Sequence, residues 1–131
     1  MSIFDAIGIA GTGVTVNRKW MDAVSDNLAN INTATRTSDP AYEAKYVVAT
    51  EAADGKGTQV AGIVTGSAAG RLEYDPTNPL ADAQGYVKYP DIDMSSQMTS
   101  LMMAQRAYQA NLQTITTAKE AYTAALQLGK A

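Results

Sequence analysis

The spacing of apolar residues differs between the two ends of this chain and its middle. Between residues 3 and 31, apolar side chains recur at steps of four and three residues, and a second run with the same spacing extends from residue 94 to residue 126. This spacing places the apolar side chains on one face of an α-helix. The sequence therefore predicts one long amphipathic helix in residues 1–33 and another in residues 91–131.

The middle of the chain, residues 34–90, shows a different pattern. Short runs of β-branched and aromatic residues are separated by clusters of Gly, Pro, Asn and Asp, which is typical of strands joined by turns. The predicted strands are residues 45–50, 59–64, 71–74 and 86–89, with a hairpin turn at Asp54 and Gly55. We therefore predict an α+β fold, in which long N- and C-terminal helices pair as a coiled coil and a small β-rich lobe is inserted between them.

The apolar faces of the two predicted helices are candidates for contacts between copies of the chain. Two helices alone bury too little apolar surface to offset the conformational entropy that is lost when they become ordered. We therefore expect other subunits to supply the remaining burial. The predicted subunit-interface residues are Ile7, Val14, Met21, Val24, Leu28, Met98, Leu101, Tyr108, Leu112, Ile115, Tyr122 and Leu126.

Two features of these helices leave alternatives open. Asn17, Gln105 and Lys119 interrupt the apolar faces, and such residues either fix the register of a coiled coil or extend to solvent. Three glycines between residues 8 and 13 either weaken the first turns of the helix or allow a neighbouring helix to approach closely.

The composition excludes most catalytic and metal-binding chemistry. The chain has no cysteine and no histidine, so it lacks disulfides, thiolate metal ligands and the commonest general base. We expect no enzyme activity, no catalytic, cofactor-binding or metal site, and no cofactor. Glu73 with Asp75, or Asp91 with Asp93, are the remaining candidates for an acid and base pair, but turn and capping roles explain these carboxylates more simply.

Charge and hydropathy restrict the partners. Phosphate contacts require a concentration of Lys and Arg, whereas the ten basic residues here are scattered and the net charge is −3, so we expect no nucleic-acid binding. No run approaches the roughly 20 apolar residues of a membrane helix, so we expect no direct membrane insertion. The first residues include no basic segment followed by an apolar one, so we expect no cleavable secretory signal.

Three sequence strings carry a resemblance to a known family. They are SDNLAN at residues 25–30, NPLADAQGYVKYP at residues 78–90 and AQRAYQAN at residues 104–111. With them, the chain resembles the flagellar axial proteins, the family of rod, hook and hook-associated subunits, and in particular subunits of the proximal rod. The motif residues are Ser25, Asn27, Leu28, Asn30, Asn78, Pro79, Gly85, Tyr86, Arg106, Tyr108, Gln109 and Asn111.

The resemblance implies a structural function. Axial proteins leave the cell through the flagellar type III export apparatus without a cleavable signal and assemble into a helical tube, with their terminal helices along its inner wall. A proximal rod subunit lies in the basal body, within the periplasmic space, and transmits motor torque towards the hook. The implied partners are other copies of the chain, the rod proteins FlgB, FlgF and FlgG, and FliE.

The same resemblance suggests roles for polar motif residues on the two helices. Asn27 and Asn30 lie three residues apart, and their amides are expected to bond to backbone near the helix end or across a subunit contact. The second helix is expected to be connected to its neighbours by Arg106, Tyr108, Gln109 and Asn111. The alternative function is a coiled-coil adaptor or export-linked interaction module of the flagellar system, which would form a complex of fixed stoichiometry.

Overall fold

The computed structural model describes residues 2–129 of the chain, and it contains two long helices and four short strands. The elements follow one another as α1 (Ile3–Asn30), β1 (Lys45–Glu51), β2 (Thr58–Thr65), β3 (Arg71–Tyr74), β4 (Tyr86–Tyr89) and α2 (Met94–Leu128). This order confirms the predicted α+β fold with a helix near each end.

Polar side chains define where both helices begin. Ser2 and Asp5 form a capping box at α1, in which each side chain accepts a hydrogen bond from the other residue's backbone N–H. Asp93 caps α2, since its carboxylate accepts a hydrogen bond of 2.7 Å from the backbone N–H of Ser96. Asp93 therefore has the capping role that explains this carboxylate more simply than catalysis does.

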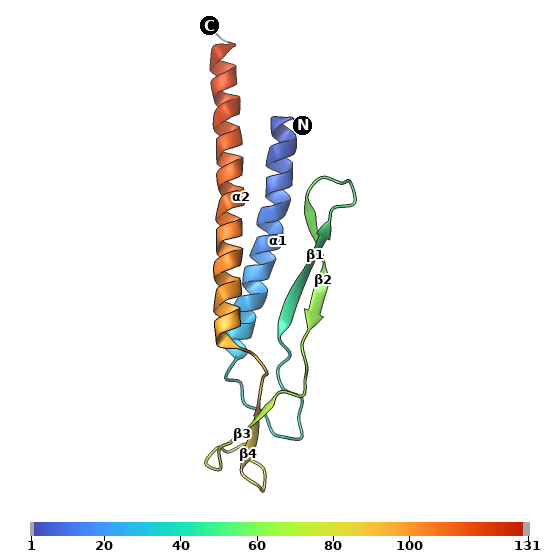
Figure 1. The fold of residues 1–131 in the computed structure, drawn as a ribbon, viewed down its shortest axis with the longest axis vertical. Helices are drawn as coiled ribbons and strands as arrows, with labels where there is room; N and C mark the ends of the chain where they lie inside the picture. Colours follow the sequence, from blue (N-terminus) through green and yellow to red (C-terminus); the bar gives the residue numbers. More distant parts are fainter. Residues whose placement is uncertain (1, 130–131) are drawn as a thin grey trace.

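The two helices pack against each other in antiparallel directions (Figure 1). At the upper end, the ring of Phe4 meets the edge of Tyr122 with 5.4 Å between ring centroids. At the lower end, the Asn27 amide donates to Gln97 Oε1 over 3.0 Å. α2 continues past the first residues of α1. Residues 119–129, which include this end of α2, are exposed.

One of the three early glycines allows the helices to approach closely. A Cβ at Gly13 would lie 2.7 Å from Nδ2 of Asn111, so a larger residue would displace the Asn111 side chain from this contact. A Cβ at Gly8 or Gly11 would meet open space. The close-approach interpretation is therefore confirmed for Gly13, and α1 begins at Ile3 in spite of the glycines.

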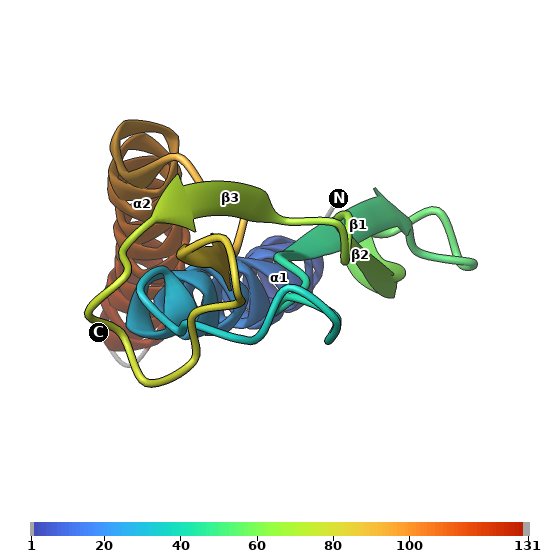
Figure 2. The same ribbon diagram turned by 90° about the horizontal axis from the view of Figure 1, so that it is seen from below.

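The β residues form two separate antiparallel sheets. β1 pairs with β2, and β3 pairs with β4. The β1–β2 hairpin lies along α1, so that α1 stands between α2 and this hairpin (Figure 2). Its tip is attached to α1 by a 3.0 Å ion pair between Lys56 and Asp5 and by a 3.1 Å hydrogen bond from the Thr58 N–H to the Thr12 hydroxyl. The β3–β4 sheet lies beyond the lower end of the helices.

The best buried part of the molecule lies where α1, β1 and α2 meet. Asn27 is fully buried there, with a relative exposure of 0%. Its Nδ2 donates to the backbone carbonyl of Lys45 over 2.9 Å and to Gln97 Oε1, while its Oδ1 accepts from the Lys45 N–H over 2.8 Å and from the Tyr42 hydroxyl. This single amide therefore connects two helices and a strand.

Replacing Asn27 with leucine should destabilise the subunit strongly. The substitution leaves the backbone groups of Lys45 without their partner, and an unsatisfied buried polar group typically costs about 1–3 kcal/mol. We expect a loss of at least about 2 kcal/mol in the free energy of unfolding, measured by urea denaturation followed by circular dichroism. Asn30→Ala is the matched control, because the half-buried Asn30 amide hydrogen-bonds to Asp26 and Thr33 and not to the backbone of β1, and it should cost clearly less than Asn27→Leu. Equal losses in the two variants would contradict this role.

The capping box should respond to acid at an unusually low pH. The Ser2 backbone N–H and the Lys56 ammonium lower the pKa of Asp5 from its ordinary value of 3.8 to about 2. Because the folded pKa is the lower one, the stabilisation is present above about pH 4 and is lost as the pH falls towards 2. An NMR titration of the Asp5 carboxyl should therefore have its midpoint near 2. In Lys56→Gln the midpoint should rise yet stay below 3.8, since the Ser2 bond remains. A wild-type midpoint of 3.8 would show that the box is not formed.

Candidate subunit interface

The surface of α2 that faces α1 is composed mainly of small and polar residues. Ala104 is fully buried, and Asn111 and Gln97 contact α1 directly. Positions spaced by three and four residues from these share the same face. The buried or half-buried residues of this face are Gln97, Leu101, Ala104, Tyr108, Asn111, Ile115 and Ala118. Three predicted interface residues, Leu101, Tyr108 and Ile115, therefore serve the contact within the subunit.

Other predicted residues on α2 point away from α1. Met98 is 46% exposed and Leu112 is 40% exposed, and Leu126 is also exposed. Met98 comes one position after Gln97, and Leu112 comes one position after Asn111. One position corresponds to a rotation of about 100° around the helix. These large apolar side chains thus lie beside the intramolecular contact, and they are free for contacts outside the subunit. Tyr122 is also exposed, although its ring touches Phe4.

The predicted residues on α1 divide in a similar way. Val24 is buried against the core, whereas Ile7, Val14, Met21 and Leu28 are only half-buried. Gly13 and Asn27 contact α2, and Val14 and Leu28 are the residues that come directly after them.

These half-buried and exposed residues gather on one side of the helix pair. In two antiparallel helices that face each other, the position after a contacting residue turns towards the same side of the pair on both helices. Val14, Met21 and Leu28 of α1 therefore line the same side as Met98 and Leu112 of α2. We call these five residues the apolar flank.

The β1–β2 hairpin leaves the apolar flank uncovered. Val16 lines the gap between α1 and the hairpin, together with Val47 and Ala49 of β1. Val16 and Val14 are two residues apart and so differ by about 200° around α1. The hairpin and the apolar flank therefore lie on opposite sides of the helix pair, and neither obstructs the other.

Polar residues that interrupt the predicted apolar faces do not form the register contact. Gln105 and Lys119 are exposed, as the solvent alternative requires, and Asn17 is half-buried. The buried Asn27 and Gln97 pair fixes the helices instead. Sequence analysis had identified Asn27 as a motif residue, but no local signal indicated that Gln97 would be its partner, because 70 residues separate the two.

The motif at residues 78–90 builds the loop between β3 and β4. Asn78 accepts a hydrogen bond from the Leu80 N–H over 3.0 Å, and Gly85 adopts a φ of 85°, which favours glycine. Tyr86 stacks edge-on against Tyr74. This motif therefore shapes a local loop. Pro79 of this motif and Ser25 of the first are exposed.

Motif residues at the second helix divide between the interior and the surface. Asn111 donates to the Ala107 carbonyl of its own helix and sits against Gly13, and Tyr108 is half-buried on the same face. Arg106 and Gln109 are exposed.

Glu73 and Asp75, one of the two carboxylate pairs that the sequence offers for acid and base chemistry, have local structural partners. Glu73 pairs with Arg71 over 3.2 Å, and Asp75 accepts hydrogen bonds from Thr77, which lower the pKa of Asp75. Within residues 2–129, no group of three or more acidic side chains is placed to hold a metal ion. None of the described helices is long and apolar enough to cross a bilayer.

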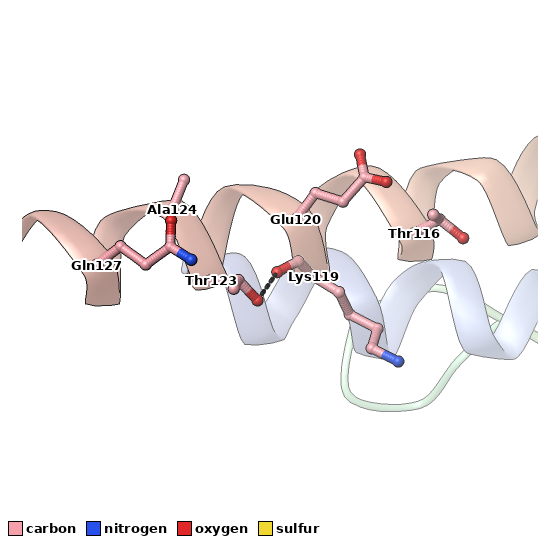
Figure 3. Close-up of a pocket in the computed structure, with 6 residues that line it drawn as sticks. All are labelled: Thr116, Lys119, Glu120, Thr123, Ala124 and Gln127. Atoms are coloured by element: carbon pink, nitrogen blue, oxygen red, sulfur yellow. Dashed lines mark hydrogen bonds between the residues drawn. The ribbon is translucent and has the colours of Figure 1, made fainter.

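A hollow on the upper part of α2 has no features of a ligand site. It is lined by side chains of a single helix, which Figure 3 shows: Thr116, Lys119, Glu120, Thr123, Ala124 and Gln127. The Lys119 and Glu120 side chains point in different directions, and the Thr123 hydroxyl donates to the Lys119 backbone carbonyl over 3.0 Å. No polar groups converge on one point, so this hollow is open helix surface.

Comparison with known proteins gives a consistent result. Residues 83–128 match the family described as flagellar basal body rod FlgEFG protein C-terminal. The chain is 37% identical to the flagellar basal-body rod protein FlgC of Salmonella typhimurium and 38% identical to that of Escherichia coli O6:H1, in each case over 99% of this chain and 100% of the relative. It is 30% identical to FlgC of Bacillus subtilis over the same shares. The chain therefore belongs to the FlgC family of flagellar basal-body rod proteins.

Proposed function

We propose that this protein is a structural subunit of the proximal rod that assembles through its terminal helices into a helical tubular shaft and transmits motor torque to the hook. The observation that carries the proposal is the apolar flank, which runs along both helices on the side that the hairpin leaves open. Val14, Met21 and Leu28 lie there on the same side as Met98 and Leu112, and none of the five is buried. An antiparallel helix pair with such a flank has the surface that a third helix requires.

The energy available from this flank supports assembly. Full burial of one large apolar side chain contributes about 1.5–3 kcal/mol, so even partial burial of five exceeds the stabilisation from an exposed ion pair. The methionines in the flank adapt to different neighbours because their unbranched side chains have several rotatable bonds. Such a surface suits a subunit whose neighbours include both its own copies and related rod proteins.

The overhang of α2 supports contacts along a shaft. Beyond Tyr122, which contacts Phe4 of α1, the last residues of α2 extend past α1 and present Leu126 and Leu128 to solvent, so these two side chains gain burial from another chain. When identical subunits join through two unlike surfaces, each contact rotates one subunit relative to the next. If these rotations do not add up to a closed ring, the subunits form an open helical assembly.

The division of the chain follows from these contacts. In our proposal, residues 1–33 and 91–131 form the shaft wall, and residues 34–90 lie further from the axis. The partners are other copies, FlgB, FlgF, FlgG and FliE, and the flagellar type III export apparatus delivers the chain without a cleavable signal to the rod within the periplasmic space. No enzymatic activity is involved.

Charges placed on the apolar flank should stop assembly without unfolding the subunit. Met98→Asp and Leu112→Asp alter exposed positions, so the isolated protein should keep its helical circular dichroism. In the assembled state the carboxylate becomes buried without a partner, at a cost of several kcal/mol. We expect a count of completed rods by electron microscopy to fall at least tenfold, while exported subunit stays at the wild-type level.

The matched control is Thr114→Asp, which places the same charge on an exposed position about 200° around α2 from Leu112. This control should assemble normally. Normal rod numbers in both flank variants would refute the proposal. A soluble complex of fixed stoichiometry, in place of rods, would instead support a coiled-coil adaptor.

A further inference from the structure

A groove opens at the lower end of the molecule, on the side of the helix pair that carries the hairpin. It lies between α1, β1 and the beginning of α2 and has a volume of about 430 Å³. Trp20 of α1 and Tyr46 and Val47 of β1 supply its apolar and aromatic walls. No residue of the apolar flank lines this groove, so it is a second and separate surface.

Two carboxylates also line the groove, and neither forms an ion pair with any residue that the structure describes. Asp91 and Asp93 belong to the segment that leads into α2. The ion pairs within residues 2–129 involve other acidic residues. Lys45 reaches the same groove, but its ammonium is held 2.9 Å from the Asp26 carboxylate. The groove therefore combines an aromatic wall with negative charge, which is an environment that favours a guanidinium group.

A buried amide adds an unused hydrogen-bond donor to the same groove. Gln97 is only 5% exposed and lines the groove, and its Oε1 accepts the hydrogen bond from Asn27. Among the hydrogen bonds of the described residues, none uses the Gln97 Nε2 as a donor, and this atom is not sealed off from the groove. A ligand that fits the groove is therefore expected to bring an acceptor as well as a cation.

The outward surface of α2 carries both of these groups. Arg106 and Gln109 are exposed and, within the described part of the chain, neither side chain makes an ion pair or a hydrogen bond. They lie three residues apart and so project from the same face of the helix, about 5–6 Å from each other. Arg106 is about 200° around α2 from the buried Ala104, so this face points away from α1.

We propose that Arg106 and Gln109 of one copy enter this groove on a second copy. The guanidinium lies between Asp91 and Asp93 and against the face of Trp20, and the Gln109 Oε1 accepts the free N–H of Gln97. The two carboxylates of the same chain are out of reach, because Arg106 is thirteen residues, or about 20 Å, along the helix axis from Asp93 and points away from α1.

This inference rests on the proposed self-assembly and names a polar contact that sets its register. The groove and the Arg106 face are different surfaces of one subunit, so each copy can donate to one neighbour and accept from another. Buried charge pairs add specificity because a misplaced partner leaves carboxylates unpaired. The apolar flank supplies contact area, and the groove selects the position of the neighbour.

Exchanging the two charges tests the contact. Asp91→Lys and Arg106→Glu should each lower the number of completed rods at least tenfold, and the double variant should recover to within threefold of wild type. Asp91 is chosen because Asp93 caps α2. Glu51→Lys, an exposed charge reversal at the end of β1 outside the groove, should leave rod numbers unchanged. Circular dichroism of each purified variant verifies the fold.

Several results of this experiment would overturn the inference. These are normal rod numbers in either single variant, or a double variant no better than the singles. If the Leu112→Asp change still abolishes rods in that case, the proposed rod function stands and only the groove contact fails. A third result is also informative: Arg106→Glu has no effect on rod number, and a mutation in another rod protein restores rods in the Asp91→Lys variant. This result would overturn the inference and assign the groove to that other protein.

Cysteine crosslinking gives an independent measurement, because the chain contains no native cysteine. Ser96→Cys with Gln109→Cys places one thiol in the groove wall and one on the opposing face. Within one chain these positions are about 20 Å apart along α2, beyond the roughly 7 Å limit for a disulfide, so any disulfide joins two copies. Oxidised basal bodies should show covalent multimers on non-reducing gels. The control pair, Ser96→Cys with Thr117→Cys, should give no covalent multimers. Equal crosslinking in the two pairs, or crosslinking in neither, would refute the contact.

Discussion

The side-chain amide of Asn27 is the interaction on which the rest of the arrangement depends. Its two polar atoms bond to the N–H and C=O of Lys45 as a neighbouring strand would, and the same Nδ2 reaches Gln97. An amide can do this because it carries both a donor group and an acceptor. The start of β1, the lower end of α1 and the start of α2 are thereby fixed relative to one another. In a buried site, any shift by one residue would leave several polar groups unsatisfied, so the register of the two helices is unique.

This register determines which surfaces the subunit presents. With Asn27 opposite Gln97, Gly13 falls opposite Asn111, and the large side chains of Met98 and Leu112 turn aside. The hairpin occupies one side of the helix pair, where Thr12 and Asp5 hold its tip. The apolar flank is left on the other side. A subunit with two distinct sides makes unlike contacts on each, which is the geometric requirement for open assembly.

The sequence predicted the elements well, because periodicity and turn residues are local signals. The predicted ranges of all four strands lie within the observed ones, and both helices agree within a few residues. What the sequence did not indicate is that small and polar residues share the contact between the two helices. Of the predicted interface residues on α2, Leu101, Tyr108 and Ile115 lie on the face towards α1, together with Gln97, Ala104 and Asn111. Which face is buried depends on contacts between residues far apart in sequence, as does the position of the hairpin along α1, and no local pattern records them.

The contact between the helices includes small and polar residues, while Met98 and Leu112 stay at the surface, and this has a physical consequence for a rod protein. The internal contacts at Asn27 and Gly13 set geometry without consuming the apolar side chains that generate association energy. Those side chains remain at the surface of the free subunit, where the absence of a neighbour leaves their burial unrealised. Association therefore gains most of its energy from the apolar flank and its precision from polar groups that must pair correctly. A shaft that carries torque requires both, since apolar contacts alone permit sliding and polar contacts alone, in competition with water, contribute little net energy.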